Sequence, residues 1–453
     1  MTLTVRRYLY IVFILAFATI TPLLILYANG YQLSLNKRGF VKTGMFILDS
    51  NPRGALVYVN GQKQAAIFDR LLGKQDAALT TPAKIKNMEP GEYDVKIELD
   101  GYWPWQKKLS IYPGASTYAE DIILFKKELP LLLVQDAFAS VSYSPDGRFA
   151  AGSARGWQLV SLSDGAAVKL PADPKARTAG WSADSKKLLI GKTLISADDP
   201  KNYSDLSKLI GDDRIDLKFD AAADNLIYCR TEDQLLVFDS LNREIKPILT
   251  GLGAGKNYKI IDYLVKERQI YLIADLGAKM VLDIYERNGE KRGSLDLPKS
   301  AGYRFVSQEH RLINLYDAVR GRLFLIDPLS PVKRVSEIIE PIKNFKWLSD
   351  SQLFYSDDFE VTLFDIGNKQ KRLIARLGNV IRQIFWHPSD NYVLYSTDNS
   401  INIIELDERV KQNVTELISL AKIGNLRLSE DGKSLFFTAS IGQADGFYQM
   451  NLQ

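Results

Sequence analysis

The hydrophobic pattern of this chain changes once near its start, and the change separates two kinds of structure. The segment from residue 8 to residue 28, YLYIVFILAFATITPLLILYA, is almost wholly apolar and carries no charge. From about residue 43 onward, apolar and polar residues alternate in short runs separated by turn residues. Apolarity over about 20 residues is typical of a membrane-spanning helix, whereas a period of two is typical of half-buried strands. The sequence therefore predicts one membrane helix followed by an all-β body.

The apolar segment is long enough to cross a bilayer. Its 21 residues, at a rise of about 1.5 Å each, give a helix of about 32 Å, against a hydrocarbon core of about 30 Å. Tyr8 and Tyr27 lie near its ends, where amphipathic rings prefer the headgroup layer. The alternative is a cleaved signal peptide, but a cut after Ala28 would place Leu26 where a small side chain is needed. We therefore expect an uncleaved anchor.

Basic residues on both sides of this segment bear on its orientation. Arg6 and Arg7 directly precede it. The basic residues that follow it, at a greater distance, are Lys37, Arg38 and Lys42. The positive-inside rule then favours a cytoplasmic N-terminus and a body outside the cell membrane. The predicted membrane-interface residues are Arg6, Arg7, Tyr8 and Tyr27.

The first unit after the anchor, residues 43–127, predicts a small antiparallel β-sandwich. ALVYVNG (55–61) ends in an Asn-Gly pair, which is a strong hairpin signal. In EYDVKIEL (92–99), one face is apolar and the other is charged, as in a half-buried antiparallel sheet. The residues of the apolar face are Tyr93, Val95, Ile97 and Leu99, and Tyr58 is expected beside them in the core.

The motifs of this unit resemble the PEGA domain. The residues that carry the resemblance are Ser50, Pro52, Gly54, Ala55, Val57 to Gly61, Thr81-Pro82, Pro90 to Tyr93, and Gly101-Tyr102 with Trp103 and Trp105. Arg53 stands where the family has Glu, Asn60 where it usually has Asp, and an insertion lies around residues 68–78. The resemblance implies an extracellular adhesion or spacer module without catalysis of its own. Trp103 and Trp105 are expected to pack on a neighbouring domain, the alternative being an aromatic platform for a sugar or peptide.

The chain from residue 129 to residue 453 is a repeat of about 40 residues. An aromatic or apolar anchor is followed by a turn containing Asp and then by an apolar strand. The anchors are Tyr143, Trp181, Phe219, Trp347, Trp386 and Leu428, with degenerate copies near Tyr263 and Val306. Each unit has room for four short strands, which is typical of a β-propeller blade. The pattern predicts an eight-bladed propeller, with seven blades and a stacked solenoid as the alternatives.

The two ends of the repeat predict how a propeller would close. The last strand, residues 447–452, is followed by no fourth strand, and residues 131–134 are available to supply it. Such pairing would remove the exposed edges of an open array. The Ser-Pro-Asp-Gly turn at residues 144–147 resembles the repeat of TolB-like propellers, and the Gly-His and Trp-Asp dipeptides of WD-like repeats are absent.

Candidate chemistry is sparse. The sequence contains no nucleophile elbow, zinc-protease motif, phosphate loop or dinucleotide fingerprint. The single Cys229 excludes an intramolecular disulfide, and His310 and His387 fall in different repeats, so no cofactor or metal site is expected. A net charge of +4 gives no electrostatic footprint for nucleic acid. The residues expected to be simply solvated are the pairs Asp198-Asp199, Asp212-Asp213, Asp357-Asp358, Lys107-Lys108 and Lys126-Lys127.

Two functions remain open at this stage. The preferred interpretation is a membrane-anchored surface protein, not an enzyme, whose propeller binds a protein or a cell-envelope glycan. The alternative is a propeller enzyme of glycosidase or lyase type, which converging acids or arginines in the channel would favour. The predicted domains are a tail at 1–7, an anchor at 8–28, a linker at 29–42, a sandwich at 43–127 and a propeller at 129–453.

Overall fold

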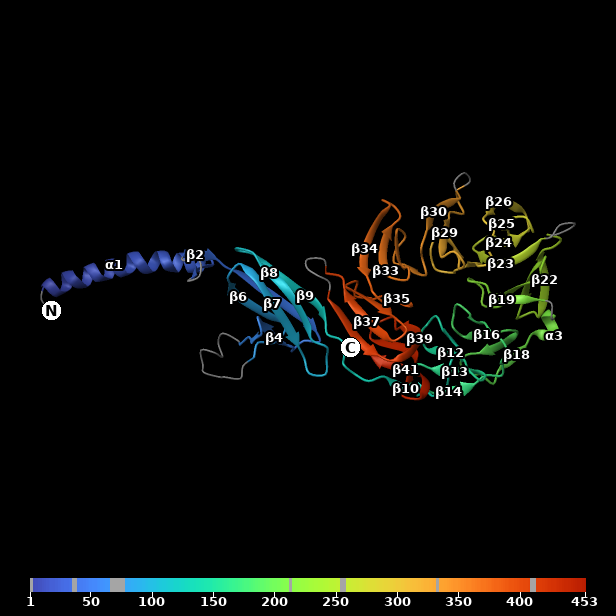
Figure 1. Cartoon of the computed structure of the whole chain (residues 1–453), viewed down its shortest axis with the longest axis horizontal. Coiled ribbons are helices and arrows are strands. Elements are labelled where there is room, and N and C mark those ends of the chain that lie inside the picture. Colours follow the sequence, from blue (N-terminus) through green and yellow to red (C-terminus); the bar gives the residue numbers. More distant parts are fainter. Residues whose placement is uncertain are drawn as a thin grey trace. The chain divides into compact units, whose positions relative to one another are not determined.

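The computed structural model describes residues 3–34, 39–65, 78–211, 214–252, 258–330, 334–407 and 413–453. Several predicted features lie outside the described residues, namely Lys37, Arg38, Asp212, Asp213 and the insertion at 68–77. Within the described ranges, every element except helix α1 (Leu3–Ala28) and the single turn α3 (Ser207–Ile210) is a strand (Figure 1). The prediction of a nearly all-β chain with one N-terminal apolar helix is confirmed.

Contacts divide the chain into two compact units. Unit 1 comprises residues 1–129, 403–417 and 451–453, and unit 2 comprises residues 130–402 and 418–450. Unit 1 contains the helix and the predicted sandwich. Unit 2 contains most of the predicted repeat.

Helix α1 begins before the predicted apolar segment and ends with it. Its residues from Val5 to Ala28 are long and apolar enough to cross a membrane, and they are not buried against the rest of the protein. The hydroxyl of Thr19 donates to the carbonyl of Leu15 at 2.8 Å, which satisfies this polar group inside the helix. By length and composition, α1 suits either a membrane anchor or a signal peptide.

The predicted linker contains a hairpin. Strand β1 (Tyr31–Ser34) pairs antiparallel with β2 (Gly39–Lys42), and Leu33 lies opposite Phe40. The backbone N–H and the hydroxyl of Thr43 both donate to the carbonyl of Gly30, each at 2.8 Å. These two bonds close the base of the hairpin beside the end of α1.

Two sheets form a sandwich in unit 1. The first sheet has the order β6 (Ala83–Met88), β3 (Gly44–Asn51), β9 (Ser116–Ile123). The second has the order β5 (Gln62–Lys63), β4 (Leu56–Val59), β7 (Gly91–Glu98), β8 (Trp105–Ile111). Both sheets contribute to one core, whose fully buried members include Phe46, Leu48, Val57, Val95 and Ile97.

The prediction of a purely antiparallel sandwich is wrong in one place, because β3 and β9 pair in parallel. Strands β7 and β8 of the opposite sheet lie between β6 and β9 in the sequence. The chain therefore returns to the first sheet by a crossover, which permits a parallel pair. Tyr58 is also misassigned to the core: its ring lies 5.5 Å from the ammonium of Lys96, and Val57 and Val59 fill the core instead.

The repeat forms eight four-stranded sheets within the described residues. In chain order, the first four are β11 (Ser140–Tyr143), β12 (Phe149–Ser153), β13 (Trp157–Ser161), β14 (Ala167–Lys169); β15 (Ala179–Trp181), β16 (Lys187–Ile190), β17 (Thr193–Ser196), β18 (Tyr203–Asp205); β19 (Ile215–Phe219), β20 (Leu226–Arg230), β21 (Leu235–Asp239), β22 (Glu244–Leu249); and β23 (Lys259–Lys266), β24 (Gln269–Asp275), β25 (Met280–Glu286), β26 (Lys291–Leu297).

The next three are β27 (Tyr303–Phe305), β28 (Ile313–Asp317), β29 (Arg322–Ile326), β30 (Val335–Ile339); β31 (Asn344–Trp347), β32 (Gln352–Ser356), β33 (Glu360–Asp365), β34 (Gln370–Arg376); and β35 (Gln383–Trp386), β36 (Tyr392–Ser396), β37 (Ser400–Glu405), β38 (Val414–Ser419). The last sheet has the order β10 (Leu131–Val134), β41 (Ala444–Asn451), β40 (Ser434–Ile441), β39 (Ala421–Leu428). Strand β10 pairs antiparallel with β41, with Leu132 opposite Tyr448, so residues 131–134 supply its outer strand as expected.

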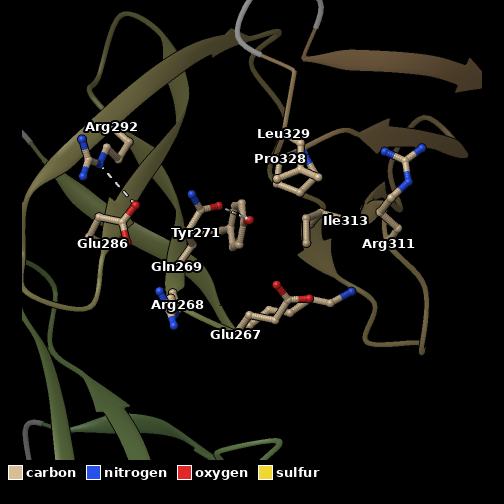
Figure 2. A pocket seen from close by; sticks show the side chains of 11 residues that line it. Glu267, Arg268, Gln269, Tyr271, Glu286, Arg292, Arg311, Ile313, Pro328 and Leu329 are labelled. Carbon is tan, nitrogen blue, oxygen red and sulfur yellow. Dashed lines mark hydrogen bonds and ion pairs between the residues drawn. The ribbon is translucent and has the colours of Figure 1, made fainter.

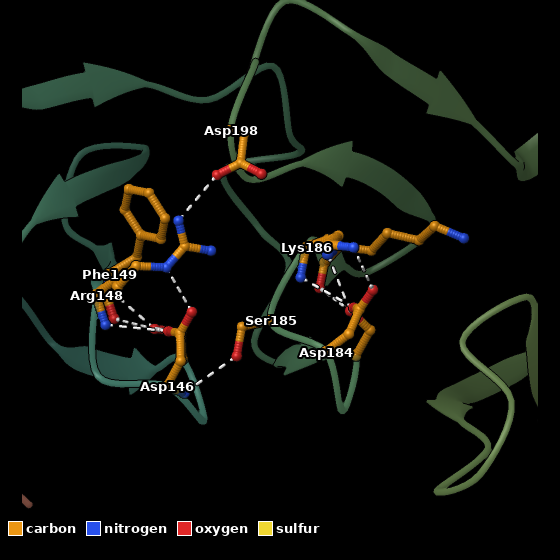
Figure 3. Close-up of polar contacts among 10 residues, drawn as sticks. Asp146, Arg148, Phe149, Asp184, Ser185, Lys186 and Asp198 are labelled. Atoms are coloured by element: carbon orange, nitrogen blue, oxygen red, sulfur yellow. Dashed lines mark hydrogen bonds and ion pairs between the residues drawn. The ribbon is translucent and has the colours of Figure 1, made fainter.

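A Ser-x-Asp turn follows each of the strands β11, β15 and β39. The hydroxyl of Ser144 donates to Asp146 at 2.7 Å and accepts the N–H of Phe149 at 2.9 Å. The same pair of bonds is formed by Ser182 with Asp184 and Lys187, and by Ser429 with Asp431 and Ser434. Figure 3 shows the first two turns, which are joined where the N–H of Asp146 donates to Ser185 at 3.0 Å. The Ser-x-Asp motif that recurs in this sequence therefore forms the same local set of hydrogen bonds in each of the three turns.

Candidate binding surfaces

The first strands of neighbouring sheets in unit 2 lie side by side. The hydroxyl of Ser142 in β11 donates to the carbonyl of Ala179 in β15 at 3.3 Å. The side chain of Gln383 in β35 accepts the N–H of Leu426 in β39 at 2.8 Å. We use "first strands" for β11, β15, β19, β23, β27, β31, β35 and β39, the first strand of each sheet in chain order from residue 140.

A cavity of about 340 Å³ opens on three first strands, β15, β19 and β23. We call it the first-strand cavity. Its lining is mixed in character, with aromatic, aliphatic and charged side chains. Among the lining residues are Trp181, Asp216, Lys218, Phe219, Tyr263 and Leu264. A mixed lining of this kind is typical of binding pockets.

The acids of this region are neutralised by nearby cations. Lys218 forms an ion pair with Asp262 and donates to the carbonyl of Tyr263 at 2.9 Å. Asp216 accepts a hydrogen bond from Nε of Arg230 at 2.6 Å. The second oxygen of Asp262 accepts the N–H of Phe305 at 2.7 Å. Each carboxylate is therefore already paired with a cationic side chain of the protein.

A larger cavity, of about 520 Å³, lies between the sheet β23–β26 and the sheet β27–β30. We call it the inter-sheet cavity, and Figure 2 shows its lining. The charged lining residues are Lys266, Arg268, Arg292, Arg311, Glu267 and Glu286. Ile313, Pro328 and Leu329 provide an apolar wall, and Leu329 is 76% exposed.

Several polar groups of the inter-sheet cavity are already paired. Nε of Arg292 lies 3.2 Å from a carboxylate oxygen of Glu286, as Figure 2 shows. The hydroxyl of Tyr271 donates to Gln269 at 2.6 Å. Burial raises the pKa of Tyr271, so its hydroxyl stays protonated and acts as a donor. The cavity therefore combines polar groups of fixed orientation with an apolar wall.

The two histidines lie in separate turns. The ring of His310 stacks on Trp347, with 3.4 Å between centroids. Its Nδ1 accepts the N–H of Leu312 at 3.1 Å, so Nε2 carries the proton and donates to the carbonyl of Asp350 at 3.1 Å. His387 Nδ1 lies 2.8 Å from the hydroxyl of Ser389. Burial lowers the pKa of both histidines, which therefore remain neutral turn residues.

The other chemical candidates also have local roles. Cys229 is fully buried in β20. Asp198 pairs with Arg148 at 3.2 Å, and Asp357 accepts the N–H of Phe359 at 2.7 Å. Asp358 pairs with Lys343. In the part of the chain that the structure describes, no group of three or more His, Cys, Asp or Glu side chains is placed to hold a metal ion.

Lys107 is not a solvated strand-edge residue, so that prediction is wrong. It is only 5% exposed, and its ammonium lies 3.3 Å from Glu405 and 2.9 Å from Asp407, all within unit 1. The indole N–H of Trp105 donates to Glu405 at 3.1 Å. Burial raises the pKa of Glu405, and the Lys107 charge partly offsets this. The partners are about 300 residues apart in the sequence, and no local pattern signals their contact.

The two tryptophans do not form a shared platform. Trp105 is 4% exposed and belongs to the core of its own sandwich, whereas packing on a neighbouring domain was expected. Trp103 is half-buried, and the ammonium of Lys127 lies 4.8 Å from the centre of its ring. Its indole N–H is buried without a hydrogen-bond partner among the described residues. Only Trp103 retains an accessible ring face, and Lys127 covers part of it.

Comparison with known families supports the assignment of the sandwich. Residues 43–120 match the PEGA domain. This range covers most of the sandwich of unit 1 and none of the repeat. A comparison with curated proteins found no match.

Solved structures with similar folds include β-propellers. The Dos1 propeller is 14% identical, with 72% of this chain and 95% of that chain covered and a TM-score of 0.48. The Cps50 (Swd1) β-propeller domain of Myceliophteria thermophila is 13% identical over 60% of this chain and 96% of that chain, with a TM-score of 0.43. A eukaryotic initiation factor is 13% identical over 69% and 85%, with a TM-score of 0.47.

Proposed function

We propose that this protein is a membrane-anchored surface protein whose eight-bladed, closed β-propeller binds a protein or a cell-envelope glycan. Three parts carry separate roles in this proposal. Helix α1 is an uncleaved anchor, the PEGA module is a spacer, and the propeller presents the binding cavities. The PEGA match and the propeller architecture support a surface or binding role in general terms.

Contacts between the first and last sheets support closure. Phe138 and Val160 of the first sheet region share a core cluster with Phe436 and Phe447 of the last sheet. The rings of Phe138 and Phe447 meet edge to face, with 6.1 Å between centroids. Core clusters of the same kind join other successive sheets, for example those containing Leu188 and Leu323. A ring of eight sheets accounts for both sets of contacts.

Helix α1 and the residues that flank it support the proposed anchor and its orientation. Tyr8 and Tyr27, 69% and 61% exposed, lie at positions suited to the two headgroup layers. Arg6 and Arg7 precede the apolar span, which favours a cytoplasmic N-terminus and an extracytoplasmic body. In this arrangement, the cavities of unit 2 face partners outside the membrane.

The pairing of Asp216 and Asp262 with cations is the observation that favours binding over catalysis. A glycosidase needs two carboxyl groups in different protonation states on either side of the bond that it cleaves. Asp216 pairs with Arg230 and Asp262 pairs with Lys218, so each carboxylate is already held by a cationic side chain. We therefore propose a binding protein without hydrolytic activity, and no nucleic acid is expected as its partner.

Two assays on the full-length protein in nanodiscs distinguish a binding function from a catalytic one. Envelope glycans and envelope proteins are first titrated against the immobilised protein, with Leu329→Glu as a variant of the inter-sheet cavity and Leu241→Glu as a control of similar exposure. Loss of binding in Leu329→Glu alone would support the proposal. The same glycans and a peptide library are then screened for cleavage. Turnover that disappears in Asp262→Asn would instead establish the enzyme.

A further inference from the structure

The hairpin between α1 and the sandwich exposes apolar side chains on one face. Leu33 and Phe40 are directly opposed in the β1–β2 pair, and they are 63% and 47% exposed. Side chains alternate across a strand, so these two lie on one face and Gln32 and Val41 lie on the other. An opposed pair of large apolar side chains is unfavourable in water, since it leaves contiguous apolar surface uncovered.

This face lies next to the end of the apolar helix. Thr43 donates twice to Gly30, so the hairpin begins and ends within a few residues of Ala28. Leu33 is two residues beyond Tyr31, the first residue of β1. At about 3.4 Å per residue, Leu33 lies about 7 Å along the strand from Tyr31, with Phe40 opposite it.

The turn between β8 and β9 of the sandwich contacts the base of the hairpin. The N–H of Gly114, in the turn between β8 and β9, donates to the carbonyl of Thr43 at 3.0 Å. Tyr112 in this turn is 65% exposed. The side chain of Lys42 packs closely over this turn. If Gly114 carried a Cβ atom, that atom would lie 2.6 Å from Cε of Lys42. Two exposed apolar residues, an exposed tyrosine and a lysine therefore gather at the end of α1.

We propose that Leu33, Phe40 and Tyr112 contact the bilayer surface, so that the hairpin lies on the membrane beside α1. Leucine and phenylalanine suit the boundary between headgroups and acyl chains, and tyrosine suits the headgroup layer. The ammonium of Lys42 is placed to reach lipid phosphates, as lysines near helix ends do. This inference rests on the proposed role of α1 as an anchor. It makes the strands β1 and β2 a membrane-bound collar and not part of a free linker.

The test places a fluorescent probe at single positions of the full-length protein in vesicles whose acyl chains are brominated. Cysteine is introduced singly by Leu33→Cys, Phe40→Cys, Gln32→Cys, Arg53→Cys and Ala18→Cys and is labelled with an environment-sensitive dye. Cys229 is fully buried, so native labelling reports the introduced thiol, with the parent protein as the blank. Gln32 is the matched control on the opposite face. Arg53 follows β3, whose eight residues span about 25 Å from Thr43.

The proposal predicts quenching at Leu33 and Phe40 at least threefold stronger than at Gln32 and Arg53. Quenching at Ala18 but only background quenching at Leu33 and Phe40 would overturn the collar and leave the anchor intact. No quenching at Ala18 would overturn the anchor itself. A blue shift of the dye at Leu33 without quenching by bromolipid would assign this face to a second copy of the chain and also overturn the proposal.

Discussion

The hydroxyl of Tyr143, in the first sheet of unit 2, donates a 2.6 Å hydrogen bond to the carbonyl of Asn425 in the last sheet. The same kind of bond joins other neighbouring sheets. The indole N–H of Trp181 donates to Ser142 at 3.2 Å, and that of Trp347 donates to Asn314 at 3.0 Å. Each donor is an aromatic anchor of the repeat or its direct equivalent. At the contact between the last and first sheets, as at the other two, an aromatic anchor donates a hydrogen bond to the preceding sheet, which supports the proposed closed ring.

Removal of the Tyr143 hydroxyl is expected to weaken this contact. Tyr143→Phe deletes the donor and leaves the Asn425 carbonyl with one partner fewer, so unfolding of unit 2 should become easier by about 1–2 kcal/mol. For a unit of this size, that corresponds to a fall in Tm of about 2–6 °C. Calorimetry measures the change. Tyr112→Phe, whose hydroxyl is on an exposed side chain, should leave Tm unchanged, and an equal fall in both variants would argue against a specific role of the Tyr143 bond.

Strand β10 is expected to be essential to the last sheet. Leu132 pairs with Tyr448, and replacement of residues 131–134 by a Gly-Ser segment of equal length removes the side chains that cover β41. The exposed edge should cause aggregation or a large loss of stability. Deletion of residues 1–42 should leave folding of unit 2 intact. Light scattering and thermal melting compare the two proteins, and equal behaviour would argue against closure by β10.

Stability should fall as the pH drops below about 6.5, the usual pKa of an unfolded histidine. Burial lowers the pKa of His310 and His387 in the folded protein. Between the lowered and the usual pKa, the unfolded state binds protons that the folded state does not, so acid favours unfolding. Each histidine contributes a slope of at most about 1.4 kcal/mol per pH unit. The variant His310→Gln/His387→Gln should show a smaller fall in Tm between pH 7 and pH 5, and an unchanged slope would contradict the assignment.

The buried ion pair between Lys107 and Glu405 is expected to stabilise unit 1. Lys107→Met leaves Glu405 buried without its cation and should destabilise the unit by about 3–5 kcal/mol. The double variant Lys107→Met/Glu405→Gln should recover part of this loss, because the stranded charge is removed. Lys108→Met is the matched control, since the neighbouring lysine is exposed. Denaturant melts provide the double-mutant cycle, and strict additivity would show that the two charges do not interact.

The strands of the repeat could be predicted because each depends on local information. The Ser-x-Asp turn at Ser144 forms its bonds within five residues, so its sequence signal and its structure coincide. The copies near Tyr263 and Val306 lack that turn, and only their spacing revealed them. The apolar alternation in β7 placed Val95 and Ile97 in the core for the same local reason.

The remaining features depend on contacts that no local pattern encodes. The Lys107 ion pair joins positions about 300 residues apart, and the parallel pairing of β3 with β9 depends on a crossover through the other sheet. The two cavities depend on how neighbouring sheets pack. The paired strands β1 and β2 lie in the predicted linker, because strands of four residues give little periodic signal.

Topology in intact cells tests the central claim most directly. The full-length protein carries one epitope tag before Met1 and another after Gln453, and protease is added outside the cells. The account predicts that the C-terminal tag is lost while the N-terminal tag stays protected with Arg6 and Arg7, because the body lies outside the membrane. Lysed cells are the control, in which both tags should be lost. A C-terminal tag that survives in intact cells and is lost after lysis would contradict the account.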